Sequence, residues 1–192
     1  MRREETTCCI VGGGPAGIVA GLLLARQGVD VLILEKHGDF LRDFWGDTIH
    51  PSTLELLHEL GWIEEFLRLP HTKMTHVTVE MAGTPITFAD FRRLRVRCPY
   101  VAFMPQWDFL DFLANKARGY RGFRLAMNAE GTELVQEADR VAGVRARTPE
   151  GQQASLAKCR SDSVMAQAPV NLRLETCLNF PPSEAGRPTV CR

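Results

Sequence analysis

Three glycines near the amino terminus have the spacing of a loop that binds the phosphates of a dinucleotide. They are Gly12, Gly14 and Gly17, within the stretch GGGPAG. In such a loop one glycine permits a tight turn, one lets the backbone approach a pyrophosphate, and one lets the following helix pack closely. The helix amino terminus offers backbone amides and a partial positive charge to the phosphates. The spacing therefore predicts an adenine dinucleotide site and leaves FAD and NAD as alternatives.

An acidic residue follows the glycines at the distance expected for a contact with ribose. Glu35 comes directly after the apolar segment 30–34, and a carboxylate there can accept hydrogen bonds from a pair of ribose hydroxyls. A glycine-rich turn without a ligand is the alternative. We favour a binding site because strand, turn, helix, second strand and acid occur in the order of a dinucleotide-binding unit.

The segments around the glycines predict a Rossmann-like fold of the α/β class. The β-branched and cysteine-rich stretch 6–11 is typical of a buried strand. Pro15 suits the first turn of a helix over 15–27, which Gly28 ends. A second buried strand over 30–34 follows, and a right-handed crossover would place it parallel to the first.

Further helices and strands are expected along the rest of the chain. Ser52 and Glu55 have the spacing of a capping box, which predicts a helix that begins at Ser52. Asp108 is expected to cap or favour the start of a helix over 108–117. The expected strands are 76–82 and 85–88, which form a hairpin, and 123–127, 132–136 and 140–147, which form a small meander. Residues 152–192 show no sustained period and are interpreted as a poorly specified tail.

The composition is that of a soluble globular protein without a dominant charge. Because 23 basic residues balance 23 acidic ones, no overall field favours nucleic acid or an anionic membrane. The uncharged run 8–25 is interrupted by glycines and Pro15, so we expect no membrane span. The six cysteines include no CxxC pair and the five histidines no HxxxH or HExxH pair. We therefore expect no metal site and a reducing, cytoplasmic environment.

Several stretches occur together in one order along the chain: GGGPAG at 12–17, LEK at 34–36, RDFWGDTIHPSTLELLHELG at 42–61 and PQWDFLDFLA at 105–114. Together they resemble the amino-terminal part of the FAD-dependent class A monooxygenases, the p-hydroxybenzoate-hydroxylase-like group. The resemblance covers roughly residues 5–151. It implies an incomplete FAD/NAD(P)-binding domain of the GR2 type with a parallel sheet and a β-meander. It also implies a partial FAD-binding domain over 1–151, an inserted substrate-domain segment with a β-hairpin around 70–103, and a divergent tail over 152–192.

The resemblance implies FAD as the occupant of the glycine loop. Glu35 would then contact the adenosine ribose, and the pyrophosphate would lie against Gly12, Gly14, Pro15, Ala16 and Gly17. Three further residues become candidates for the cofactor, namely Lys36, Arg42 and Gln106. For Lys36 and Arg42 the alternative is a solvated surface charge, and for Gln106 it is a helix cap or a surface polar group.

The implied reaction is reduction of FAD by NADH or NADPH, reaction with dioxygen, and hydroxylation of an aromatic or similar small molecule. No catalytic acid or base can be named, and the oligomeric state is not predicted. The Asp-Gly signature expected after the meander is absent from 152–192, and Trp45 stands where relatives carry an arginine. We therefore expect a truncated product whose tail comes from a shifted frame or an alternative end. The alternatives are another FAD-dependent reductase or dehydrogenase and a non-catalytic nucleotide-binding protein.

Overall fold

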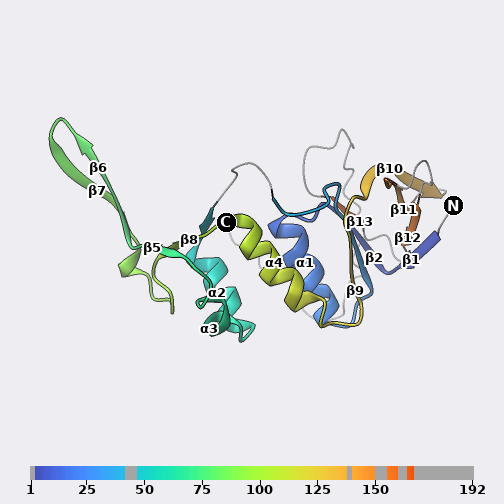
Figure 1. Ribbon diagram of the computed structural model, residues 1–192, viewed down its shortest axis with the longest axis horizontal. Coiled ribbons are helices and arrows are strands. Elements are labelled where there is room, and N and C mark those ends of the chain that lie inside the picture. The colour runs from blue at the N-terminus through green and yellow to red at the C-terminus, as the bar shows by residue number, and fades with distance from the viewer. Residues whose placement is uncertain (1–2, 42–46, 138–139, 150–154, 160–163, 167–192) are drawn as a thin grey trace, which may run out of the picture. The chain divides into compact units, whose positions relative to one another are not determined.

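The computed structural model describes residues 3–41, 47–137, 140–149, 155–159 and 164–166 (Figure 1). The chain divides into two compact units, one made of Met1–Gly38 with Ala117–Arg192 and the other of Asp39–Lys116. The second unit is wider than the insertion predicted around 70–103. The assignment of these parts to FAD-binding and substrate domains stays a prediction.

A four-stranded parallel sheet forms the base of the first unit. Its strand order is β13-β2-β3-β9. The central strands β2 and β3 are buried along their whole length, as expected when both faces of a parallel sheet are covered. The strands are β2 (Cys8–Val11), β3 (Val31–Leu34), β9 (Phe123–Ala126) and β13 (Val164–Ala166).

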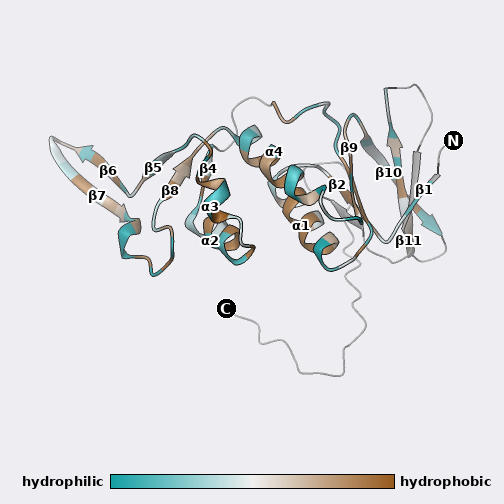
Figure 2. Ribbon diagram, turned by 60° about the horizontal axis from the view of Figure 1, so that its bottom comes forward, coloured by the Kyte–Doolittle hydropathy of each residue, from teal (hydrophilic) through white to brown (hydrophobic). Residues whose placement is uncertain are grey.

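The helix α1 (Pro15–Arg26) connects β2 to β3, and these two strands are parallel as predicted. Hydrophobic residues dominate it (Figure 2). A Cβ atom at Gly21 would lie 2.6 Å from Cδ1 of Ile33, so glycine allows the helix to lie close against the sheet. Gly28 has a φ of 82° and ends this helical region as predicted.

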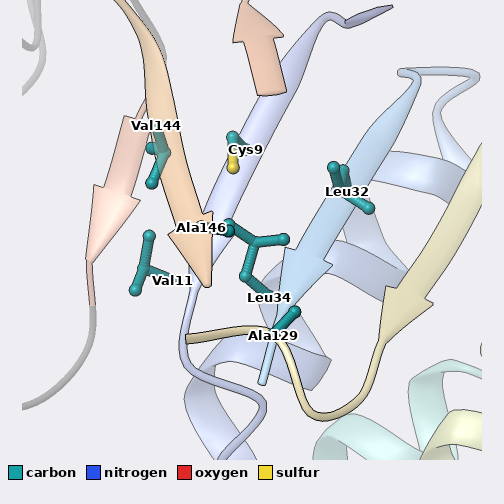
Figure 3. Close-up of a cluster of buried hydrophobic side chains, with 7 residues drawn as sticks. All are labelled: Cys9, Val11, Leu32, Leu34, Ala129, Val144 and Ala146. Atoms are coloured by element: carbon teal, nitrogen blue, oxygen red, sulfur yellow. The ribbon is translucent and has the colours of Figure 1, made fainter. Parts of the chain in front are cut away.

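A second sheet of the same unit has the order β1-β12-β11-β10. Its strands are β1 (Arg3–Thr6), β10 (Glu130–Glu137), β11 (Arg140–Arg147) and β12 (Ser155–Cys159). Side chains from the two sheets meet in one hydrophobic cluster (Figure 3), made of Cys9, Val11, Leu32, Leu34, Ala129, Val144 and Ala146. A Cβ atom at Gly131 would lie 2.9 Å from Cγ1 of Val11, so glycine keeps β10 close to this cluster.

The structure confirms one strand prediction in this unit and corrects two others. The buried central strand predicted at 6–11 is β2, which begins at Cys8, whereas Thr6 ends β1 of the other sheet. The three strands predicted for the meander are present as β9, β10 and β11, but β9 pairs with β3 in the parallel sheet. The antiparallel meander is made of β10, β11 and β12 instead. Residues 155–159 and 164–166 of the predicted unspecified tail form β12 and β13, which pair with β1 and β2. The rest of the tail, residues 160–163 and 167–192, lies outside the described residues.

Arg124 on β9 joins three parts of the first unit. Its guanidinium donates to the carboxylate of Asp30 at 3.1 Å, to the backbone carbonyl of Glu5 at 2.8 Å and to Oε2 of Glu4 at 3.3 Å. These acceptors lie on β1 and just before β3. Arg124 therefore ties the amino-terminal strand to the sheet that carries the glycine loop.

Replacing Arg124 with alanine should lower the urea midpoint of unfolding. The network is partly exposed, so we expect a loss of about 1 kcal/mol in the free energy of unfolding. Arg121→Ala is the matched control, because Arg121 is exposed in the turn before β9. Equal midpoints for the two variants would show that the network adds nothing to stability.

The unit Asp39–Lys116 combines helices with a three-stranded antiparallel sheet, in the order β4-β8-β5. The ring of Phe66 contacts Phe109 and Phe112 edge-on, with centroids 5.9 and 5.3 Å apart. Phe109 and Phe112 therefore pack against Phe66 within this unit. The elements are β4 (Thr48–Ile49), α2 (Pro51–Glu59), α3 (Ile63–Phe66), β5 (Thr72–Met74), β8 (Val101–Phe103) and α4 (Gln106–Ala117).

The predicted hairpin is present as β6 (His76–Met81) and β7 (Thr84–Asp90), followed by the short 3-10 helix η1 (Phe91–Arg93). The apolar side chains of Met81 and Phe88 are exposed by 62% and 65%. Within the described residues, no helix is long and apolar enough to span a membrane.

The helix starts in this unit differ from the prediction. The helix α2 begins at Pro51, and His50 in the N-cap position makes no side-chain cap. The predicted capping box of Ser52 and Glu55 is therefore wrong, and Glu55 instead accepts a hydrogen bond from the backbone of Arg97. The helix α4 begins at Gln106, so Asp108 lies inside its first turn.

Candidate dinucleotide-binding site

The candidate loop begins where β2 ends. The amide of Gly12 donates to the carbonyl of Leu34 at 2.8 Å, which extends the β2–β3 pairing by one step. Gly12 has a φ of 111°, a backbone conformation that favours glycine. This conformation explains the glycine at the first position of the spacing.

Gly13 is the residue that brings the loop against Glu35. Its amide donates to Oε2 of Glu35 at 2.6 Å. A Cβ atom at this position would lie 2.9 Å from Cβ of Glu35, too close for a real contact. The GxGxxG spacing assigns no role to Gly13, so the sequence analysis missed it. The run of three consecutive glycines was the only signal for it.

Glu35 is held in place at the carboxyl end of β3. It is 2% exposed, and Oε1 accepts a hydrogen bond from the amide of His37 at 3.0 Å. Its own amide and carbonyl bond to Ala126 and Ala129 at 2.8 and 2.7 Å. A carboxylate has about four lone-pair positions, so accepting these two amides is compatible with accepting ribose hydroxyls as well.

The amino terminus of α1 is suited to an anion. Gly14 is its N-cap and has no side chain that could cover the first turn, Pro15 occupies the first helical position, and the first turn contains no acidic residue. Ala16 is exposed and Gly17 is buried against the sheet. The positive end of the helix dipole is therefore not neutralised by a local carboxylate.

The sheet topology supports the same location for a ligand. The chain leaves β2 through α1 to β3 on one side, while the neighbour of β2 on the other side is β13, from much later in the chain. In open parallel sheets, ligands bind beyond the carboxyl ends of the strands at such a switch point. Gly12, Gly13 and Gly14 lie at this place.

The structure brings together only part of the predicted site. The loop Gly12–Gly17 and Glu35 belong to one unit and are joined by the Gly13–Glu35 hydrogen bond. Lys36 is exposed directly after Glu35. Arg42 lies outside the described residues. Gln106 begins α4 in the other unit, so its role in the cofactor site stays a prediction.

Asp90 and Tyr100, both in the unit Asp39–Lys116, have clearly shifted pKa values. The hydrogen bond from the Arg92 side chain lowers the pKa of Asp90 to about 2. Burial, with a hydrogen bond to Cys98, raises the pKa of Tyr100 above its usual value. Near neutral pH, Asp90 is ionised and Tyr100 is protonated, so neither titrates where a general acid or base would have to.

Residues 5–160 match the family described as "FAD binding domain". The chain belongs to this family, which includes FAD-dependent monooxygenases and halogenases. The match confirms the resemblance to class A flavin monooxygenases, and it extends beyond residue 151, the end of the resemblance in the sequence.

Curated relatives and solved structures agree with this assignment. The chain is 30% identical to the 6-methylpretetramide 4-monooxygenase of Streptomyces rimosus over 73% of this chain and 34% of the relative. The structure of the myxobacterial chondrochloren halogenase CndH matches with a TM-score of 0.74 and 25% identity, over 88% of this chain and 38% of that one. The anhydrotetracycline hydroxylase OxyS from Streptomyces rimosus matches with a TM-score of 0.69 and 27% identity, over 85% and 31%. The chain thus spans about a third of the length of each.

Proposed function

We propose that this chain binds FAD at the loop Gly12–Gly17, as the FAD-binding part of a monooxygenase. The observation that carries the proposal is the Gly13–Glu35 contact, because it places a buried carboxylate beside a loop with the backbone geometry of a pyrophosphate site. The family match supports FAD over NAD as the occupant.

Each residue of the loop would have a separate task. The glycines would let the pyrophosphate come close to the loop, the amides at the start of α1 would donate to it, and Glu35 would accept hydrogen bonds from the adenosine ribose. The amides of Gly12 and Gly13 would instead hold the shape of the loop, because they donate to Leu34 and Glu35. When bound, FAD supplies the redox chemistry, with NADH or NADPH as reductant and dioxygen as oxidant. The protein orients the cofactor and excludes water from it.

Hydroxylation is the reaction class that we favour. Two relatives are a 6-methylpretetramide 4-monooxygenase and an anhydrotetracycline hydroxylase, which supports hydroxylation of an aromatic or similar small molecule. We also propose a GR2-type domain, with the β6–β7 hairpin as part of a substrate domain, and a cytoplasmic location. Binding of FAD without turnover is a second candidate function, because the chain spans about a third of its relatives.

FAD binding can be tested with the purified chain. We expect FAD to co-elute with the protein in gel filtration and to raise its melting temperature, since a ligand selective for the native state stabilises it. Bleaching of the bound flavin by NADH or NADPH would support an enzyme, and bound flavin that neither reduces would support binding alone. Protein that stays colourless in excess FAD would contradict the proposal.

The matched variant for this experiment is Gly14→Val. A branched side chain at the N-cap of α1 should keep the pyrophosphate away from the backbone and weaken FAD binding. Unchanged FAD affinity in this variant would mean that the loop is only a turn.

A further inference from the structure

The turn after β9 carries an asparagine in an uncommon backbone conformation. Asn128 has a φ of 54°, and among the residues that the structure describes only Ala82 shares a positive φ without being glycine. Asparagine tolerates this left-handed conformation better than most residues do. The residue is exposed and follows the carboxyl end of β9, the strand that borders β3. An exposed side-chain amide therefore stands at the edge of the sheet where the candidate site lies.

Two backbone hydrogen bonds tie this turn to the residues around Glu35, all within one compact unit. The amide of Asn128 donates to the carbonyl of His37 at 2.9 Å, and the amide of Ala129 donates to the carbonyl of Glu35 at 2.7 Å. The amide of His37 in turn donates to Oε1 of Glu35. Asn128 is thus bonded to the same residue that holds the Glu35 carboxylate.

Gly38 makes room for the side-chain amide of Asn128. A Cβ atom at Gly38 would lie 2.9 Å from Oδ1 and 3.1 Å from Nδ2 of Asn128. The φ of Gly38 lies outside the left-handed region, so its backbone does not require glycine. Glycine at this position therefore serves the amide, which lies against the segment that follows Glu35.

The order of strands in the parallel sheet sets the direction in which a bound adenosine would extend. The glycine loop follows β2, Glu35 follows β3 and Asn128 follows β9, and these three strands are neighbours in that order. Adenosine has the same order of parts, because its ribose stands between the phosphates and the base. With the phosphates at the loop and the ribose at Glu35, the base extends toward the end of β9, one strand spacing of about 4.8 Å further.

We propose that the side-chain amide of Asn128 accepts a hydrogen bond from the N6 amino group of adenine and makes the site selective for this base. The inference rests on the proposed FAD function and adds a residue that recognises the base of the cofactor. An asparagine amide carries the acceptor oxygen that an adenine amino group needs. ADP has the same base as FAD, so the affinities for both ligands depend on Asn128.

Replacing Asn128 with glycine removes the amide and suits the backbone. Glycine adopts a positive φ without steric cost, so Asn128→Gly should keep the melting temperature of the parent chain. We expect it to bind FAD and ADP about three- to tenfold more weakly, the usual effect of one neutral hydrogen bond. Ala82→Gly is the matched control, because it places glycine at the other positive φ, in the turn between β6 and β7. This control should leave both affinities unchanged.

Gly38→Ala gives a second variant that keeps Asn128 itself. The added methyl group would displace the amide, which is the end of a flexible side chain, and would not strain the backbone. Binding of FAD and ADP should weaken to a similar extent as in Asn128→Gly. The double variant should bind no more weakly than Asn128→Gly alone, because both substitutions remove the same contact.

The base contact is isolated by an analogue of ADP that carries unsubstituted purine in place of adenine. This analogue, purine riboside 5′-diphosphate, lacks the N6 amino group and keeps the ribose and the pyrophosphate. Titrations should show that the parent chain binds ADP about three- to tenfold more tightly than the analogue. Asn128→Gly should bind the two ligands about equally.

The outcomes separate this inference from the proposed function. If the parent chain binds neither FAD nor ADP, the proposed function fails and this inference fails with it. If the parent chain binds both and Asn128→Gly binds them equally well, only the Asn128 inference is overturned. Weaker binding by Asn128→Gly with an unchanged preference for ADP over the analogue would also overturn it, by showing that Asn128 only shapes the turn.

Discussion

Gly13→Ala should weaken FAD binding by about tenfold or more, equivalent to at least about 1.4 kcal/mol. The added methyl group would lie 2.9 Å from Cβ of Glu35, and that atom is fixed by its own backbone. The loop must therefore move away from β3, which breaks the Gly13–Glu35 hydrogen bond and shifts the amides that face the pyrophosphate. Overpacking of this kind also costs about 1–3 kcal/mol in the free energy of unfolding.

Gly28→Ala separates the effect of crowding from that of backbone strain. Gly28 has a φ of 82°, and a methyl group added there would meet nothing within 4 Å. Alanine there should destabilise the fold by about 1 kcal/mol without changing FAD affinity. Fluorescence titration with FAD and urea unfolding measure both quantities. Equal FAD affinity for Gly13→Ala and the parent chain would remove Gly13 from the site.

Local sequence patterns predicted the segment that forms β2, α1 and β3 well. The helix α1 and the strand β3 lie within one residue of the predicted bounds, because an apolar period, Pro15 and Gly28 are local signals. The division between β1 and β2 has no such signal. It depends on Asp30, whose carbonyl accepts from the amides of Thr7 and Cys8 and from the Thr6 hydroxyl.

Strand pairing was the part of the fold that the sequence could not provide. The segment that forms β9 has the length and composition of a meander strand, but its partner is β3, far away in the sequence. The short strands β12 and β13 are stabilised by pairing with β1 and β2 at the opposite end of the chain. Such pairings depend on tertiary context more than on local propensity.

The site shows the same division between local and tertiary information. Spacing predicted Gly12, Gly14, Gly17 and Glu35 as candidates. The role of Gly13 requires the register of β2 and β3, in which Val11 lies opposite Leu34, so that the loop and Glu35 follow side by side.

Glu35→Gln should have effects on both stability and binding. The carboxylate accepts one amide on each oxygen, and glutamine replaces one acceptor with an NH₂ group that would face a donor. Leaving a buried amide without its acceptor should cost about 1–3 kcal/mol in the free energy of unfolding. Loss of the acceptor for ribose should weaken both FAD and ADP by about tenfold or more.

The control for Glu35→Gln is Glu133→Gln on β10, where an exposed carboxylate pairs with Arg145 at 3.0 Å. An exposed pair contributes at most about 1 kcal/mol, so this variant should keep both its stability and its affinities. Urea unfolding gives the urea concentrations at which each variant is still folded. Titrations with FAD and ADP are then carried out on folded protein. If Glu35→Gln is destabilised but binds both ligands as the parent chain does, Glu35 only supports the loop. Equal losses for FAD and ADP would instead place Glu35 at the half of the cofactor that the two ligands share.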